Sequence, residues 1–375
     1  MQIPFHKTHT TQEEIDAATE AIQSGWLTMG PKTVEFENKF KEYIGSLEAV
    51  SMNSATAALH LGLKAIGLKR DDEVILPTNT FVATAEVVTY FDAIPVLCDL
   101  EENTHNMDVS KIEALITDNT KAIIPVHFAG QPCDMDEIYV IANRYNLKII
   151  EDAAHAIPSS YKGSKIGNLK KSDVTCFSFY ATKTLSTGEG GMATTNNPEY
   201  AKSMKINRLH GISKDAWDRY TIKGAWRYDI VDNGCKYNTT DINSAIGIVQ
   251  LKKQNNLREK REAIANKYND AFKSNSKIII PFLKEDRITS WHLYVIKIEN
   301  RDEVIEKLKA EGVGCSVHFI PVHKHTYYKN KYGYKNEDYP IANKVFDKSL
   351  SLPIYPDMSD EEVEYVINKV KEIVS

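Results

Sequence analysis

The sequence predicts an α/β fold with a large domain built on a mostly parallel central sheet and a smaller α+β domain at the carboxyl-terminal end. Between residues 48 and 195, short apolar runs alternate with helical stretches. The runs are too short for core helices, and most lack strict polar alternation, as in strands that are buried on both faces. Beyond about residue 240, one long helical pattern is followed by a second, smaller set of strands and helices.

Five short apolar runs are expected to form strands of the large domain. They cover residues 73–76, 94–97, 122–126, 148–150 and 174–179. Ahead of them, residues 11–24 have the pattern of an amphipathic helix, and Thr11 with Glu14 has the signature of a capping box.

The carboxyl-terminal third predicts a smaller unit of mixed strands and helices. Its expected elements are a strand near 291–298, a helix over 301–311, a strand near 315–320 and a last helix opened by Ser359 and Glu362. A long helical stretch over residues 241–275 precedes this unit and is expected to bridge the two domains. We place the boundary near residue 250, with a large domain at 1–250 and a small domain at 251–375.

Composition and charge favour an ordinary globular protein. The chain has 375 residues, 42% of them apolar and 26% charged, and its net charge of −5 indicates neither nucleic acid nor a membrane surface as partner. Five cysteines stand singly, without the spacing of a zinc site or a disulfide framework. No apolar run has the length of a signal core or a membrane span. We therefore expect a cytoplasmic protein that binds no metal ion.

Polar residues follow two of the expected strands, at the place where ligands bind in open α/β sheets. Glu151 and Asp152 come directly after one strand, and a carboxylate there can pair with a cationic ring nitrogen; a helix cap by Asp152 is the structural alternative. Lys183 follows another strand and precedes a glycine-rich turn. A lysine becomes a nucleophile when its ammonium group is partly desolvated, whereas a solvated surface lysine does not.

Small and aromatic side chains stand beyond other strands. Ala55 and Thr56 open a predicted helix whose free N–H groups suit a phosphate, although such residues also occur in ordinary helix caps. Ser178 precedes Lys183 by five residues and can add a hydroxyl to the same phosphate. Phe81 can stack on a flat cofactor or pack in the core, and Asn238 can anchor a ligand or cap the long helix.

Taken in order, these motifs resemble the DegT/DnrJ/EryC1/StrS family of sugar-nucleotide aminotransferases, which belongs to the fold-type I pyridoxal-phosphate enzymes. The resemblance extends from the loop at 25–31 to the segment at 352–356. The matching segments are Asn53-Ser54-Ala55-Thr56-Ala57-Ala58-Leu59, Glu151-Asp152-Ala153-Ala154-His155, Phe177-Ser178-Phe179-Tyr180-Ala181-Thr182-Lys183, Gly188-Glu189-Gly190-Gly191 and Tyr237-Asn238. The resemblance implies pyridoxal 5'-phosphate as cofactor, pyridoxamine 5'-phosphate as its aminated form, and a homodimer.

The resemblance also implies a role for each matching residue. Lys183 would be the Schiff-base lysine, and Asp152 would pair with the pyridinium nitrogen so that the ring acts as an electron sink. Phe81 would stack on the face of the ring. His155 would support the ring or Asp152.

The phosphate group would be held by residues from two subunits. Ala55, Thr56 and Ser178 would bind it within one chain. Asn238 would reach it from the neighbouring subunit, so that the active site is shared between the two copies of a homodimer.

The implied reaction has two halves. Glutamate would give up its amino group and leave as 2-oxoglutarate, and a keto-sugar nucleotide would then receive that group, with Lys183 moving a proton in each half. Ping-pong kinetics would follow. One subgroup of the family replaces the lysine with histidine and removes oxygen from sugars, and some members were first linked to regulation. A dehydratase and a non-catalytic regulator are therefore the alternatives, and the presence of Lys183 argues against both.

The substrate is expected to be a 4-keto sugar nucleotide used for surface-polysaccharide or amino-sugar biosynthesis. Segments 125–130, 237–243 and 312–319 resemble the branch that makes 4-amino-4-deoxy-arabinose on UDP. Tyr180 and Thr184 replace the His and Asn of that branch, so a 4-keto-6-deoxyhexose on UDP, dTDP or GDP is an equal alternative, and a 3-keto sugar is a further one. The candidate substrate contacts are Trp26, Met29, Lys32, Tyr180, Arg208, His318 and Tyr327.

Overall fold

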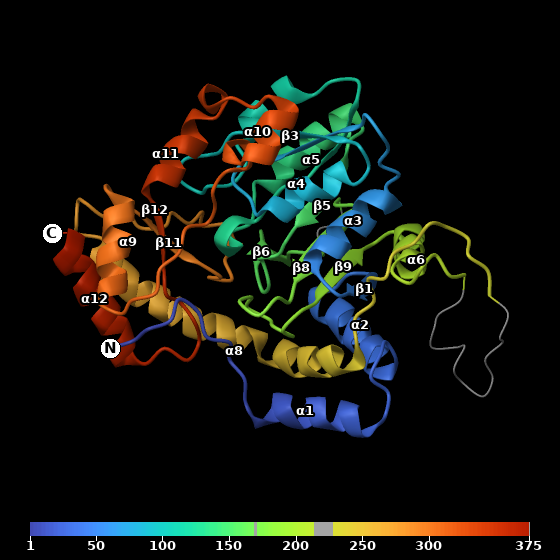
Figure 1. The fold of residues 1–375 in the computed structure, drawn as a ribbon, viewed down its shortest axis with the longest axis horizontal. Helices are drawn as coiled ribbons and strands as arrows, with labels where there is room; N and C mark the ends of the chain where they lie inside the picture. The colour runs from blue at the N-terminus through green and yellow to red at the C-terminus, as the bar shows by residue number, and fades with distance from the viewer. Residues whose placement is uncertain (169–170, 214–227, 375) are drawn as a thin grey trace.

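A computed structural model describes residues 1–168, 171–213 and 228–374. At its centre lies a seven-stranded sheet in the order β1-β9-β8-β5-β4-β2-β3 (Figure 1). Its strands are β1 (Glu48–Met52), β2 (Glu73–Pro77), β3 (Ile94–Cys98), β4 (Thr120–Ile123), β5 (Lys148–Asp152), β8 (Val174–Ser178) and β9 (Gly191–Thr195). Strand β9 pairs antiparallel with both of its neighbours, whereas every other pair in the sheet is parallel. The predicted mostly parallel sheet is confirmed.

Helices cover both faces of this sheet. One face packs on α3 (Ala55–Ala65), α4 (Val82–Thr89) and α6 (Pro198–Asn207), and the other on α2 (Pro31–Ile44), α5 (Met135–Tyr145) and the first half of α8 (Asp241–Phe272). Side chains along a strand alternate between the faces. In β2, Val74 and Leu76 enter the first apolar cluster and Ile75 enters the second. The sequence pattern is a continuous apolar run because both clusters exclude water.

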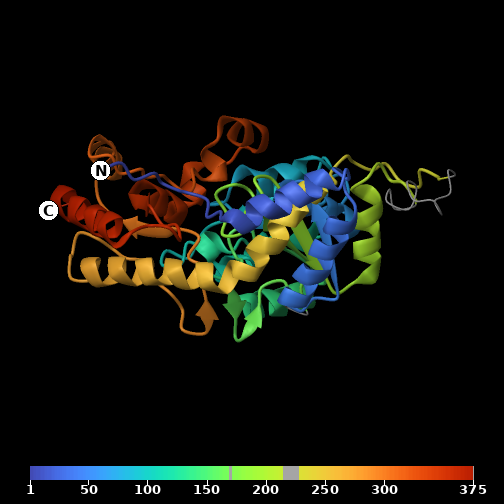
Figure 2. The same ribbon diagram turned by 90° about the horizontal axis from the view of Figure 1, so that it is seen from below.

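The second half of α8 belongs to a third apolar cluster, together with elements of the carboxyl-terminal part of the chain. These include β11 (Tyr294–Lys297), α9 (Arg301–Ala310), β12 (Ser349–Leu352) and α12 (Asp360–Val374). Figure 2 shows α8 running between this unit and the sheet, with α1 (Gln12–Gln23) beside it. Helix α8 continues through residue 250 without a break, and the domain division there stays a prediction.

Shorter elements complete the structure. They are a small sheet of β6 (Ser160–Tyr161), β7 (Ser164–Lys165) and β10 (Arg287–Ile288), and the helices α10 (Thr326–Tyr332) and α11 (Pro340–Lys348).

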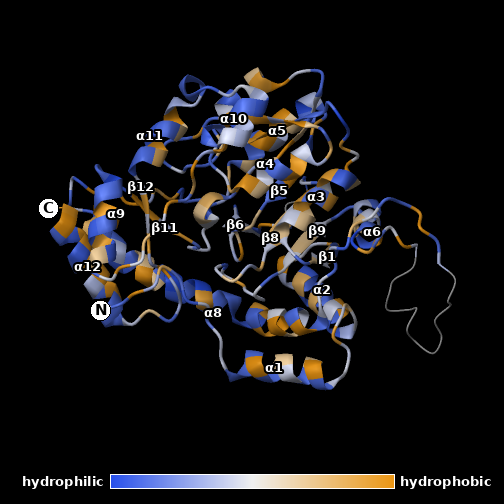
Figure 3. Ribbon diagram, in the orientation of Figure 1, coloured by the Kyte–Doolittle hydropathy of each residue, from blue (hydrophilic) through white to orange (hydrophobic). Residues whose placement is uncertain are grey.

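Both predicted capping boxes are confirmed. At α1, the Thr11 N–H donates to Glu14 Oε2 at 2.8 Å. At α12, the Ser359 N–H donates to Glu362 Oε2 at 2.9 Å, and the Glu362 N–H donates to Ser359 Oγ at 3.2 Å. Each cap contributes about 1 kcal/mol to its helix. Figure 3 shows apolar and polar residues alternating along both helices, as an amphipathic helix requires.

The predicted strand near 315–320 is wrong. In this stretch, only Ser316 pairs as in a sheet, through an isolated bridge to Ser351. Val313, just before the stretch, is already paired with Ile3, and at its far end the Phe319 N–H donates to the side chain of Asn79 at 3.0 Å. The stretch therefore touches β12 at one bridge and otherwise forms a loop whose far end contacts Asn79, just after β2.

Strand β9 was not among the predicted strands, because its small residues and threonines lack a long apolar run. Among the described helices, none is long and apolar enough to cross a membrane. The five cysteines are free. Within the described ranges, no group of three or more histidine, cysteine or acidic side chains is placed to hold a metal ion.

Candidate active site

A cavity of about 620 Å³ lies beyond the carboxyl ends of the parallel strands. Its volume falls within the range of roughly 300–1,000 Å³ that is usual for small-molecule sites. It brings together nine of the predicted site residues, which are Ala55, Thr56, Phe81, Asp152, His155, Ser178, Tyr180, Lys183 and His318. Residues far apart in the sequence therefore converge on one site.

Lys183 lies in the turn after β8, where its N–H donates to Tyr180 O at 2.8 Å. Burial lowers the pKa of its ammonium group to about 8, although the negative charge of Asp152 opposes this change. A fraction of this lysine is therefore neutral at physiological pH. The neutral amine is the form that attacks a carbonyl carbon and accepts a proton.

Asp152 ends β5, and its carboxylate is held in a fixed direction. The Thr84 hydroxyl donates to Oδ2 at 2.7 Å, and the Ala154 N–H donates to Oδ1 at 3.1 Å. Its backbone is fixed as well, because the Asp152 N–H donates to Pro125 O at 2.9 Å. The side chain is only 6% exposed, yet it lines the cavity. A carboxylate in this position suits a cationic ring nitrogen.

The neighbouring Glu151 points to the opposite face of the sheet. Its carboxylate lies 2.8 Å from His127 Nε2 and accepts a hydrogen bond from the Thr175 hydroxyl at 2.9 Å. The Cys133 N–H donates to His127 Nδ1, so the histidine proton lies on Nε2 and is donated to Glu151. Glu151 therefore has a structural role, and Asp152 is the acid that faces the cavity.

The amino-terminal end of α3 forms a cradle for an anion. The Ser54 hydroxyl caps the helix by accepting from the Ala57 N–H at 3.1 Å, and Ala55 and Thr56 line the cavity beside it. The first N–H groups of a helix have no partner within it and attract phosphate. A side chain at Gly191 would lie 2.3 Å from the Ser54 carbonyl carbon, so the glycine lets β9 approach this cradle closely.

Aromatic rings and histidines form the remaining walls. Phe81 precedes α4 and is 59% exposed, with its ring 5.9 Å from that of Phe319. The His155 ring stacks on Phe319 and lies 4.3 Å from His292. Burial, followed by the charge of Lys183, lowers the pKa of His155 well below its usual value. His155 is therefore a neutral group at physiological pH.

These residues fit pyridoxal phosphate. The α3 end supplies N–H donors and Ser178 a hydroxyl for the phosphate, Asp152 supplies a carboxylate, and Lys183 supplies an amine with a lowered pKa. His155 Nδ1 is buried without a hydrogen-bond partner among the described residues, as expected where a ligand is to be accommodated.

Several cavity residues were missed by the sequence analysis. The most prominent are Phe5, His6, His292 and Phe319. His6 lies 177 residues before Lys183, and no local pattern marks it as part of the site. His292 follows a tryptophan at the start of the predicted strand near 291–298, and nothing in that pattern marks it as part of a site.

Six predicted residues do not line this cavity. The Lys32 ammonium pairs with Glu20 at 3.0 Å, and the Trp26 indole donates to Met29 O at 3.1 Å. Lys32, Trp26 and Met29 are thus three of the six. The remaining three are Arg208, which is buried, Tyr327, which is exposed on α10, and Asn238, whose side chain donates to Thr239 O at 3.0 Å. Their predicted substrate or cofactor contacts stay predictions.

Arg208 has a complete set of contacts inside the chain. Its guanidinium forms a buried ion pair with Glu37 and donates to Ser51 O at 3.0 Å. We expect Arg208→Met to lower the free energy of unfolding by about 3–5 kcal/mol, because it leaves the Glu37 carboxylate buried without its cation. Urea denaturation measures this change, with the exposed Arg70→Met as control. Unchanged stability together with a raised KM for the sugar would instead assign Arg208 to substrate binding.

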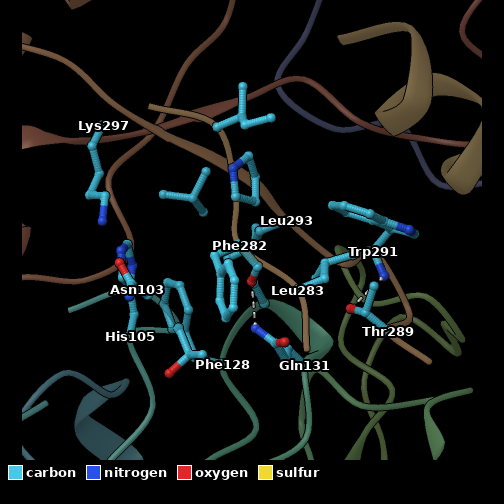
Figure 4. A pocket seen from close by; sticks show the side chains of 15 residues that line it. Asn103, His105, Phe128, Gln131, Phe282, Leu283, Thr289, Trp291, Leu293 and Lys297 are labelled. Atoms are coloured by element: carbon cyan, nitrogen blue, oxygen red, sulfur yellow. Dashed lines mark hydrogen bonds between the residues drawn. The ribbon is translucent and has the colours of Figure 1, made fainter. Parts of the chain in front are cut away.

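A second cavity lies between the sheet and β11 but holds only about 30 Å³ (Figure 4). Its walls are mainly apolar, with His105 and Lys297 at one side. Since a single water needs roughly 10–15 Å³, this space has room for about two or three waters and is too small for a sugar nucleotide. Leu293 lines both cavities and separates the small space from the active site.

Comparison with known proteins agrees with this geometry. The profile of the DegT/DnrJ/EryC1/StrS aminotransferase family matches residues 8–371. An uncharacterized protein of Methanocaldococcus jannaschii is 51% identical over 370 residues, which cover 97% of this chain and 95% of that protein. The spore coat polysaccharide biosynthesis protein SpsC of Bacillus subtilis is 46% identical over 379 residues, covering 99% and 97% of the two chains.

Among solved structures, the chain is similar to Spr1654 of Streptococcus pneumoniae, which is named as a candidate sugar aminotransferase. Its pyridoxamine-phosphate form is 36% identical in sequence and superposes with a TM-score of 0.93. The match covers 100% of this chain and 99% of that chain. The same protein is also solved with pyridoxal phosphate. The chain therefore belongs to the DegT/DnrJ/EryC1/StrS aminotransferase family and is a pyridoxal-phosphate-dependent sugar aminotransferase.

Proposed function

We propose that this enzyme transfers the amino group of glutamate to a keto-sugar nucleotide, with 4-keto sugars favoured over 3-keto sugars, for amino-sugar or surface-polysaccharide biosynthesis in the cytoplasm. The pairing of Lys183 and Asp152 in one cavity carries the proposal. Its family membership supports amino transfer to a sugar, and the relative from spore coat polysaccharide biosynthesis supports the pathway class.

When bound, pyridoxal phosphate supplies an electron sink next to the reacting nitrogen. The residues of the chain supply the rest. Asp152 would hold the proton on the ring nitrogen, and Ser178 with the α3 end would fix the phosphate. Lys183 would remove a proton from the donor carbon and return one at the cofactor. The surrounding aromatic walls would keep water away from these transfers.

We further propose that the working unit is a homodimer in which Asn238 of a second copy completes the phosphate cradle. Asn238 does not line the cavity of its own chain, although it precedes α8 by only three residues. Phe81 and Tyr180, at the cavity, have exposed side chains at 59% and 47%, as expected for residues that a second copy would cover.

A substrate panel tests the proposed reaction. Glutamate would be incubated with the loaded enzyme and several 4-keto and 3-keto sugar nucleotides on UDP, dTDP and GDP, and products would be identified by mass and NMR. A product that carries an amino group in place of the 4-keto oxygen, with release of 2-oxoglutarate, supports the proposal. A deoxygenated sugar would favour a dehydratase, and bound cofactor without turnover across the panel would favour a regulator.

The pKa of Lys183 predicts how cofactor uptake depends on pH. Because only the neutral amine reacts and its pKa is about 8, the uptake rate of the cofactor-free protein should rise about tenfold per pH unit up to pH 8 and then level off. Stopped-flow absorbance of the lysine–cofactor link measures this rate. A rate that keeps rising to pH 10 would show an ordinary, solvated lysine.

A further inference from the structure

An N-terminal strap, defined as residues 3–9, crosses from the small unit to the turn that carries Lys183. Ile3 is buried and pairs with Val313. The Ile3 N–H donates to Gly312 O at 2.8 Å, and the Ile3 carbonyl accepts a hydrogen bond from the Gly314 N–H at 2.8 Å. Figure 1 traces the strap from the N label, beside α12 and β11, toward α1. The strap is therefore attached to an element distant in the sequence.

The loop that receives the strap is shaped for it by glycine. A side chain at Gly314 would lie 2.5 Å from the Phe5 nitrogen, and one at Gly312 would lie 2.3 Å from the Met1 carbonyl oxygen. Gly312 also has a φ of +79°, whereas Gly314 lies outside the left-handed region that favours glycine. At Gly314, close approach of the strap is thus the reason for glycine.

The middle of the strap binds the lysine turn directly. His6 Nε2 lies 3.1 Å from Ala181 O, and the Thr8 hydroxyl donates to the same oxygen at 2.7 Å. Burial is the main cause that lowers the pKa of His6 to about 4, so the ring is neutral at physiological pH. A carbonyl only accepts, and the His6 proton therefore lies on Nε2. Two donors on the strap hold a carbonyl two residues before Lys183.

The strap is also part of the cavity wall. Phe5 and His6 both line the cavity, and the Phe5 ring stacks on that of His318 at 5.4 Å. At the other end of the strap, His9 Nδ1 lies 2.7 Å from Asp357, outside the cavity lining. One segment thus connects the small-unit loop, the cavity and the lysine turn.

We propose that the N-terminal strap positions Lys183 for proton transfer, with His6 and Thr8 as positioning residues that act through the Ala181 carbonyl. Within the turn, the Lys183 N–H donates to Tyr180 O at 2.8 Å. The two strap donors add an external hold on the same turn. The proposal rests on the role of Lys183 in the proposed function and extends it to a segment 177 residues away.

The test combines removal of the donors with a readout that needs no turnover. In His6→Ala/Thr8→Val, hydrogen exchange of the Lys183 amide in the cofactor-free protein should speed up about tenfold or more, because two hydrogen bonds are lost. In the loaded protein, the rate of the glutamate half-reaction at saturating glutamate should fall about tenfold. The glutamate concentration that gives half of the maximal rate should change less than about twofold. Gly314→Ala, which keeps both donors but displaces the strap, should give the same pattern.

Two matched variants make the result specific. Thr8→Ser keeps a donor and should behave as wild type, and so should His9→Ala, which removes a strap contact away from the cavity. Unchanged exchange and rate in the double variant, or equal losses in His9→Ala, would overturn the proposal. If the wild-type protein fails to react with glutamate, the proposed function fails, whereas the exchange measurement still decides the role of the strap.

Discussion

Lys183→Ala should bind pyridoxal phosphate without a covalent link and lose amino transfer by about 10³-fold or more. The expected loss is large because the same amine would move the proton in both halves of the reaction, and a positioned acid–base group contributes about 10²–10⁴-fold by itself. The phosphate cradle and Asp152 are untouched, so the variant should still take up the cofactor. Single-turnover release of 2-oxoglutarate measures the loss, and borohydride treatment followed by mass spectrometry measures the link.

The control for this variant is Lys252→Ala, which removes an exposed lysine of α8 outside the cavity. It should keep both the covalent link and the activity. A Lys183→Ala protein that still forms a borohydride-stable adduct would show that another amine holds the cofactor, and the assignment of Lys183 would be wrong.

Asp152→Asn should lower the rate of the glutamate half-reaction by roughly 10²–10³-fold, comparable to the loss of one preorganised electrostatic contact elsewhere. An amide of the same shape keeps an oxygen for the Thr84 hydroxyl but has no negative charge to hold a proton on the ring nitrogen. Stopped-flow absorbance during the glutamate half-reaction measures the effect. Asp136→Asn, which alters an exposed ion pair with Lys162, is the matched control.

The same variant has a second expected effect, on Lys183. The charge of Asp152 raises the lysine pKa against the effect of burial. Its removal should therefore move the midpoint of cofactor uptake to a pH below 8. A midpoint that moves upward, or a half-reaction at the wild-type rate, would show that Asp152 does not face the cofactor.

Most of the site could be predicted because its parts follow strand ends. Asp152 ends β5, Lys183 follows β8 by five residues, and the α3 end follows β1, and these strands point in the same direction, so their ends converge on one edge of the sheet. Their order along the chain and their shared position after strands, together with the family resemblance, indicated this grouping. Local pattern was sufficient for the capping boxes, in which partners lie three residues apart.

The remainder depends on contacts that no local pattern encodes. His6 reaches the lysine turn through a strap held by a distant glycine loop. Arg208 was predicted to contact the substrate, and its ion pair with Glu37 of α2 is one that no local pattern indicates. The predicted strand at 315–320 has β-like composition, yet it pairs only through one bridge, from Ser316 to Ser351, and its far end contacts Asn79 instead.

Transfer of ¹⁵N from labelled glutamate tests the central claim most directly. Loaded enzyme would be incubated with ¹⁵N-glutamate, washed free of it, and then given a 4-keto sugar nucleotide. We predict one 2-oxoglutarate per active site in the first step, followed by ¹⁵N on the sugar at the former keto carbon in the second. A first step without 2-oxoglutarate, or a sugar that comes out without ¹⁵N, would contradict an amino transfer carried by Lys183 and the bound cofactor.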